Sequence, residues 1–229
     1  MANKVMSWSS ENIVQLNPDK CKELRTSFSN QPRAFYPVVV DGKELYVFDT
    51  VERLGVTLTN QLTWNPHIEK VIKKASKRLY FLVQLKRAKL PIEALVLFYM
   101  TCIRYVIDYA IPAFYCSLPQ YLKSELVRLE KRALSIITPG QDYQTATKIL
   151  NVKPLQDYHE HLCEKLFKAA ISDPTHKIGK LLPTRNEANY DLRNKRTFNV
   201  LRARTNRLKN TFILAKCNSL QNYNFPNTS

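Results

Sequence analysis

Five cations between residues 68 and 84 recur at helical spacing, and their chemistry suits a polyanionic partner. At about 100° per residue, the apolar side chains of this stretch fall on one helical face and the cations on the opposite face. The apolar residues are Ile68, Ile72, Ala75, Leu79 and Leu82, and the cations are Lys70, Lys73, Lys74, Lys77 and Arg78. Cations that neutralise phosphates release condensed counterions, so this face predicts contact with a nucleic-acid backbone. A face that only keeps the protein soluble is the alternative, although such faces more often mix both signs of charge.

Three aromatic residues suggest a second kind of contact with nucleic acid. Tyr80, Phe81 and Tyr99 could stack on nucleic-acid bases, because every base has an aromatic face. Aromatic side chains at helical spacing belong more often to a hydrophobic core, and we favour that interpretation here.

His159, His161 and Cys163 invite a metal-site interpretation that their spacing does not favour. On a helix, His159 and Cys163 share a face, whereas His161 points away from both. No Cys-x-x-Cys motif accompanies them, so we predict no metal site and assign Cys163 to the core. Arg104 and Asp108 lie four residues apart in an apolar stretch, which predicts a structural ion pair.

The composition fits a nucleic-acid partner and an intracellular protein. The net charge of +16 is unusual for an enzyme of small molecules and fits a polyanion. The five cysteines are odd in number and follow no secretory signal, so they predict reduced thiols in the nucleus or cytoplasm. The apolar stretch 91–116 has only ten uncharged residues between Glu93 and Arg104. Because a bilayer span needs about 20, we predict a core helix and no membrane partner.

The elements that must position these residues change in type near residue 65. Runs of β-forming residues predict strands at 20–29, 35–40, 44–48 and 51–58. Asp41-Gly42 predicts a tight hairpin turn, since both of its central positions need positive φ, and Gly55 suggests a bulge in the last strand. A period of 3.6 residues then predicts helices at 65–88, 92–112, 119–137, 142–150 and 154–172, the third of them capped by Ser117. The predicted fold class is α+β, with a small antiparallel sheet, a mostly α-helical bundle and a basic tail.

Composition also predicts a division into four segments. These are a sheet-containing segment at 1–62, a helical bundle at 63–140, further helices at 141–183 and a basic, partly disordered tail at 184–229. Residues 185–216 hold nine Lys or Arg against two acids and show little apolar periodicity, which predicts an irregular tail. Arg193, Lys195 and Arg196 in this tail are predicted as further nucleic-acid contacts.

Several sequence blocks carry a family resemblance. They are Leu16-Asn17-Pro18-Asp19-Lys20-Cys21-Lys22-Glu23, Leu54-Gly55-Val56-Thr57-Leu58, Trp64-Asn65-Pro66-His67 and the basic helix that follows. Together they resemble the C-terminal part of the reverse transcriptase of LINE-type (non-LTR, jockey-like) retrotransposons. The resemblance implies the end of a polymerase palm, a thumb-like bundle, a basic tail and an origin in a mobile element.

The resemblance also implies roles for individual residues. It places Lys20, or by spacing equally Lys22, beside the leaving pyrophosphate, although we favour a solvated surface lysine here. It also makes Leu54, Gly55 and Val56 a primer-grip-like turn. In that family an aromatic-x-Asp-Asp turn upstream of the matching region holds two Mg²⁺ ions. No two acidic residues are adjacent in this chain. The resemblance therefore implies no catalytic residue, metal or cofactor here, and no polymerase activity from this chain alone.

Two functions remain open from the sequence. The first is a fragment of an RNA-directed DNA polymerase that contacts a primer–template through its phosphates. The second is a non-enzymatic nucleic-acid-binding protein, either domesticated or the product of a degenerate element. Both predict an RNA–DNA or duplex partner that is bound without sequence specificity.

Overall fold

The computed structural model describes residues 2–28, 34–186, 197–200 and 202–220. Its internal contacts divide the chain into two units, Met1–Lys70 and Val71–Ser229. The predicted α+β class is confirmed, because pairs of short antiparallel strands lie in the first unit and helices dominate the second. Helix α2 (Asn65–Arg87) begins in the first unit and continues into the second.

The described part of the first unit contains helical segments, including the start of α2, and two separate β-hairpins. Its helices are α1 (Ala2–Glu11) and the short 3₁₀ turn η1 (Pro18–Lys20). Strand β1 (Val39–Val40) pairs with β2 (Lys43–Glu44), and β3 (Thr50–Arg53) pairs with β4 (Val56–Thr59), both antiparallel. The turn between β1 and β2 is Asp41-Gly42, with φ values of 50° and 73°, which confirms the predicted hairpin.

The prediction that the strands at 20–29, 35–40, 44–48 and 51–58 form one small antiparallel sheet was wrong, because the strands pair as two separate sheets. Residues 20–28 contribute one isolated bridge, between Glu23 and Val47, in the part that the structure describes. Residues 51–58 were expected as one strand with a bulge, but they fold back at Leu54-Gly55, where φ is 48° and 75°. Both values suit a type I′ turn. An apolar leucine at the first turn position concealed that turn in the sequence.

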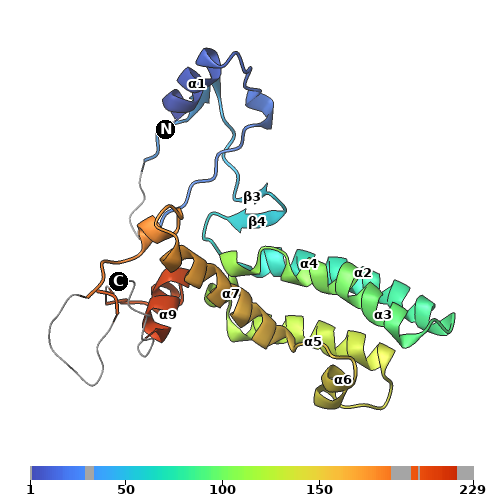
Figure 1. Ribbon diagram of the computed structural model, residues 1–229. Coiled ribbons are helices and arrows are strands. Elements are labelled where there is room, and N and C mark those ends of the chain that lie inside the picture. Colours follow the sequence, from blue (N-terminus) through green and yellow to red (C-terminus); the bar gives the residue numbers. More distant parts are fainter. Residues whose placement is uncertain (1, 29–33, 187–196, 201, 221–229) are drawn as a thin grey trace. The chain divides into compact units, whose positions relative to one another are not determined.

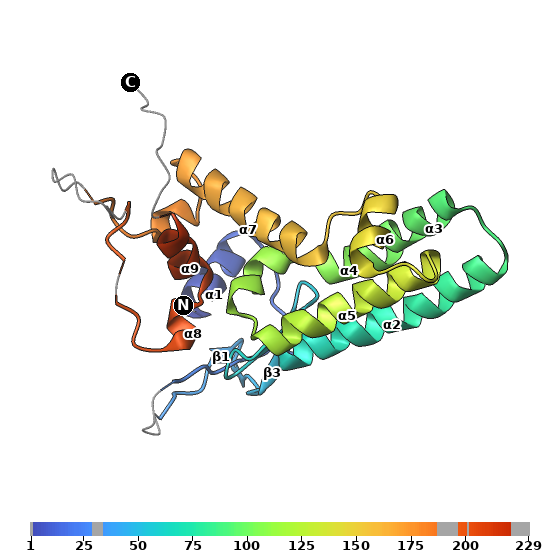
Figure 2. The same ribbon diagram turned by 90° about the horizontal axis from the view of Figure 1, so that it is seen from below.

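The second unit is built from helices, and the ends of α2 and of three later ones lie close to the predicted ends. After α2 come α3 (Ile92–Phe98), the π-helical segment η2 (Tyr99–Arg104) and α4 (Tyr105–Asp108). Next are α5 (Gln120–Ile137), α6 (Tyr143–Ile149) and α7 (Leu155–Ser172). Figures 1 and 2 show α2, the α3–α4 stretch and α5 lying side by side. Amphipathic periodicity therefore predicted these helices well.

Two local predictions in this unit were wrong. The helix expected at 92–112 ends at Asp108, because Ala110 adopts a left-handed φ of 56° and Pro112 enters the 3₁₀ turn η3 (Ile111–Ala113). Ser117 does not cap α5. It ends the turn η4 (Tyr115–Ser117), its hydroxyl donates to the Phe114 carbonyl at 2.8 Å, and Pro119 occupies the N-cap position.

The core of the second unit lies between the inner faces of these helices. Each fully buried leucine or isoleucine stabilises the fold by about 1.5–3 kcal/mol relative to an exposed one. From α2 the core receives Val71, Ala75, Leu79 and Leu82, and from α5 it receives Leu122, Leu126, Leu129, Ala133, Leu134 and Ile137. These contacts fix which face of α2 remains in solvent.

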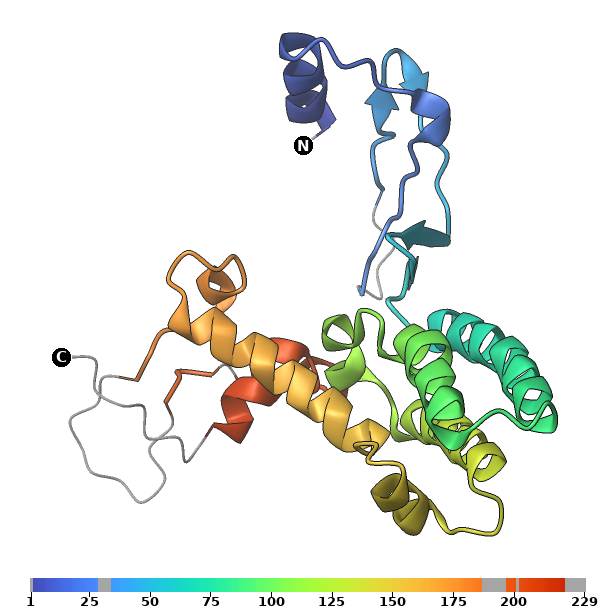
Figure 3. The ribbon, with the colours of Figure 1, turned by 45° about the vertical axis from the view of Figure 1, so that its right-hand side comes forward.

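The C-terminal region is more ordered than its composition predicted. It contains the turn η5 (Gly179–Leu181) and the helices α8 (Asn206–Lys209) and α9 (Phe212–Ser219). Figure 3 shows α9 beside α7. The prediction of an irregular tail was therefore wrong for α8 and α9.

One helical stretch in the described residues, Ile92–Ala113, is long and apolar enough to cross a bilayer by length and composition alone. Core helices of other proteins pass the same test, so this finding is weak evidence for a membrane span. The side chain of Arg104 within the stretch is only 3% exposed and forms ion pairs inside the fold.

Candidate nucleic-acid interface

Three lysines of α2 form an exposed cationic face, which we call the lysine face. Lys73, Lys74 and Lys77 are all exposed. None of the ion pairs found among the described residues involves any of them. Lys70 differs, because its Nζ lies 3.2 Å from Oε2 of Glu52 in an exposed pair. No ion pair within 4.0 Å therefore neutralises these three lysines in the described residues, and the acid beside them on α2 is the exposed Glu69, four residues before Lys73.

Two other cations of α2 hold the helix in place. A guanidinium nitrogen of Arg78 donates to the carbonyl of Cys102 in η2. Lys86 Nζ donates to the carbonyl of Ile137, at the C-terminal end of α5, over 3.0 Å. Arg78 was predicted with the phosphate-binding cations, but its position next to the buried row of α2 brings it to a neighbouring helix. Both bonds fix the orientation of the lysine face.

Two aromatic rings extend the lysine face. Tyr80 is 62% exposed and Phe81 is 56% exposed. Their ring centroids lie 5.7 Å apart with an interplanar angle of 74°, so they meet edge to face. The favoured assignment of these two residues to the core was wrong, whereas Tyr99 is fully buried as expected.

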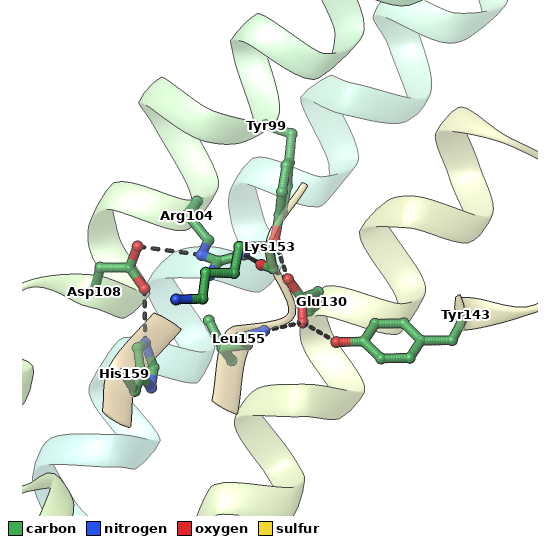
Figure 4. A network of polar contacts seen from close by, with 8 residues as sticks. All are labelled: Tyr99, Arg104, Asp108, Glu130, Tyr143, Lys153, Leu155 and His159. Atoms are coloured by element: carbon green, nitrogen blue, oxygen red, sulfur yellow. Dashed lines mark hydrogen bonds and ion pairs between the residues drawn. The ribbon is translucent and has the colours of Figure 1, made fainter. Parts of the chain in front are cut away.

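Inside the second unit, Glu130 of α5 is fully buried and accepts four hydrogen bonds (Figure 4). Its Oε1 accepts from the Tyr99 hydroxyl at 3.0 Å and from Arg104 Nη1 at 2.6 Å. Its Oε2 accepts from the Tyr143 hydroxyl at 2.5 Å and from the Leu155 amide at 2.9 Å. The donors come from η2, α6 and the start of α7, so one carboxylate joins three neighbours of α5.

Arg104 links this carboxylate to a second one. Its Nε donates to Asp108 Oδ2 at 3.1 Å, which confirms the predicted i, i+4 pair. Its Nη1 also donates to the Lys153 carbonyl at 3.0 Å. Oδ1 of Asp108 lies 2.7 Å from Nε2 of His159. His159, for which a metal site was considered and not favoured, therefore belongs to this network. The described residues contain no cluster of His, Cys, Asp and Glu that could hold a metal ion.

The electrostatics of the network keep Tyr99, Tyr143 and Arg104 protonated. Burial, followed by the charge of Glu130, raises the pKa of the Tyr99 phenol. Burial and the hydrogen bond to Glu130 do the same to the pKa of Tyr143. Burial opposes the charge on Arg104, but Tyr99, Asp108 and Glu130 together raise its pKa. Because the side chains of Arg104 and Glu130 are 3% and 0% exposed, the network is structural.

The remaining predicted residues lie in the first unit or outside the described residues. Lys20 is exposed at the end of η1. Leu54 and Gly55 form the exposed turn of the β3–β4 hairpin, and Val56 begins β4. Arg193, Lys195 and Arg196 lie outside the described residues.

Sequence reasoning missed Glu130 and the exposed rings, although both left a signal. Glu130 follows Leu126 by four residues and precedes Ala133 by three, which places its charge on the inner face of α5. Phe81 follows Lys77 by four residues, which places it on the side of the lysines. In both cases helical position was more informative than residue type.

Comparison with known protein families matches residues 64–104 to the family described as alkylated DNA repair protein alkB homolog 8, N-terminal. The matched stretch is less than a fifth of the chain and includes α2, α3 and η2. No curated protein and no solved structure matches the chain.

The assignment to LINE-type reverse transcriptases was wrong. The family matched over residues 64–104 is not a reverse transcriptase family, and this stretch includes the Trp64 block and the basic helix that carried the resemblance. Those motifs are short, and the Leu54-Gly55 block is an ordinary hairpin turn. The polymerase role, the mobile-element origin and the roles implied for Lys20 and the Leu54–Val56 turn rested on that assignment and lose their support with it.

Proposed function

We propose that this chain binds nucleic acid through the lysine face of α2, mainly by contacts to the phosphate backbone. The observation that carries the proposal is the exposure of Lys73, Lys74 and Lys77 without an acidic partner among the described residues. Surface lysines that serve solubility alone are usually interspersed with acids. Contacts to phosphates carry no sequence information, so binding is non-specific and salt-dependent.

Two further features support this partner. The net charge of +16 attracts polyanions at long range. The family matched over residues 64–104 is described as a DNA repair protein, and the matched stretch contains all three lysines of the face.

The test is the salt dependence of binding to a labelled duplex and a labelled single strand, followed by fluorescence anisotropy between about 50 and about 200 mM salt. The variant carries Lys73→Glu, Lys74→Glu and Lys77→Glu. Each phosphate contact contributes about 0.9 to the slope of log K against log salt on B-form duplex, and about 0.7 on single strands. We expect the slope to flatten by about 3 units on duplex and about 2 on single strands. Glutamate is a good helix former, so α2 stays folded.

A matched control separates the lysine face from total charge. Lys148→Glu, Lys165→Glu and Lys177→Glu change exposed lysines elsewhere in the second unit and cause the same change in net charge. This control keeps most of the parent slope. A control that flattens the slope as much as the α2 variant, or an α2 variant that binds like the parent, contradicts the proposal. Replacing Arg202, Arg204 and Lys209 with Gln measures how much the described part of the tail contributes to nucleic-acid binding.

A further inference from the structure

The two exposed rings beside the lysine face present apolar surface that contacts with phosphates would leave uncovered. Tyr80 and Phe81 are each more than half exposed, although large apolar rings gain from burial. Their edge-to-face geometry, with planes 74° apart, means that neither ring stacks flat on the face of the other. A phosphate backbone offers these faces no aromatic partner.

The rings and the lysines lie close enough to contact one strand. Tyr80 follows Lys77 by three residues and Phe81 follows it by four, so all three side chains are neighbours on the helix surface. From Lys73 to Tyr80 the helix rises about 10 Å, at 1.5 Å per residue. That distance matches about three nucleotides of a stacked strand at 3.4 Å each.

From this arrangement we infer that the lysine face binds single-stranded nucleic acid, with unpaired bases stacking on Tyr80 and Phe81 while the lysines contact the phosphates. The inference rests on the proposed function and names its substrate class. In a duplex each base is covered on both faces by its neighbours and offers only its edges in the grooves. A flexible single strand can turn one base onto each ring, and such stacking depends little on sequence.

The test compares two single strands of equal length and charge, one carrying bases and one abasic throughout, in both deoxyribose and ribose forms. The full chain binds the base-bearing strand more tightly than the abasic strand. The Tyr80→Ala, Phe81→Ala double variant loses this difference, because each stacked base contributes roughly fivefold to hundredfold in affinity. Its affinity for the abasic strand and for duplex stays within about twofold of the parent, since the lysines remain.

Two controls make the outcome specific to ring stacking. Tyr80→Phe keeps the ring and retains the preference for bases. Tyr105→Ala removes a tyrosine that is 64% exposed outside α2 and leaves the preference unchanged. Loss of the preference in the double variant with either sugar supports the inference. Equal affinity of the parent for base-bearing and abasic strands overturns it, as does an unchanged preference in the double variant. The variant with Lys73, Lys74 and Lys77 replaced by Glu binds both the base-bearing and the abasic strand more weakly than the parent. Unchanged affinity in that variant contradicts the proposed function, whatever the result for the rings.

Discussion

Glu130 illustrates how one buried charge can organise several helices. All four of its hydrogen-bond partners are donors, two of them on each carboxylate oxygen. Among these, the Arg104 guanidinium and the Leu155 amide cannot accept a hydrogen bond. The carboxylate is therefore matched to its site by charge and by acceptor count, and an amide of the same shape cannot replace it.

We predict that Glu130→Gln destabilises the fold by about 3–5 kcal/mol, because it leaves Arg104 with an incomplete set of acceptors in the interior. In either orientation, the new amide NH₂ meets an N–H donor, from Arg104 or from Leu155. Urea denaturation measures the loss. The control is Glu125→Gln on the same helix, which removes an exposed pair with Arg128 and costs less than about 1 kcal/mol. Equal losses in the two variants would show that Glu130 has no special structural role.

At the scale of elements, the long amphipathic helices and the β1–β2 hairpin turn could be predicted, whereas the extents and pairing of the other strands could not. The ends of α2, α5, α6 and α7 fall within one residue of prediction, because each buries one long amphipathic face. Strands of two to four residues have too few positions for alternation to be read. Among the site residues, angular position around the helix was enough to predict that Lys73, Lys74 and Lys77 lie on its exposed face. The rings were missed because their residue type was weighed above their angle, and Glu130 because its partners are distant in sequence.

In the β3–β4 hairpin, the residue type of Leu54 is unfavourable for its backbone conformation, and a substitution can relieve this strain. Leu54 adopts a φ of 48° at the first turn position, where a left-handed conformation costs an ordinary residue about 1–2 kcal/mol. Asn-Gly is a preferred pair for this turn, so Leu54→Asn should stabilise the hairpin by about 1 kcal/mol. Slower hydrogen exchange at the amides of β3 and β4 is the measurement. Asp41→Asn in the other hairpin is the control, and it changes little because Asp already tolerates this conformation. Unchanged exchange after Leu54→Asn would contradict the argument.

At the scale of the whole molecule, the basic C-terminal region is anchored by apolar contacts that its composition concealed. Phe167, Phe198 and Cys217 form a buried cluster, around which Ile171, Leu182, Val200, Phe212, Ile213 and Leu220 pack. The rings of Phe167 and Phe212 meet edge to face at 6.1 Å. Truncation after Leu182 would uncover this cluster, so the share of the tail in nucleic-acid binding has to be tested by charge-neutralising substitutions in the full chain.

Phe167 is the central residue of this anchor, because it lies on α7 and contacts α9 through Phe212. Phe167→Ala removes a side chain that is only 3% exposed, and large-to-small changes of this kind cost about 3–5 kcal/mol. We expect the loss to be local, with faster hydrogen exchange in α8 and α9 while the amides of α2 and α5 remain protected. Leu181→Ala, at a position 68% exposed, is the matched control and leaves exchange unchanged. If α9 stays protected in Phe167→Ala, the helix is held by something other than this cluster. If α2 and α5 lose protection together with α9, the C-terminal region unfolds with the bundle as one cooperative unit.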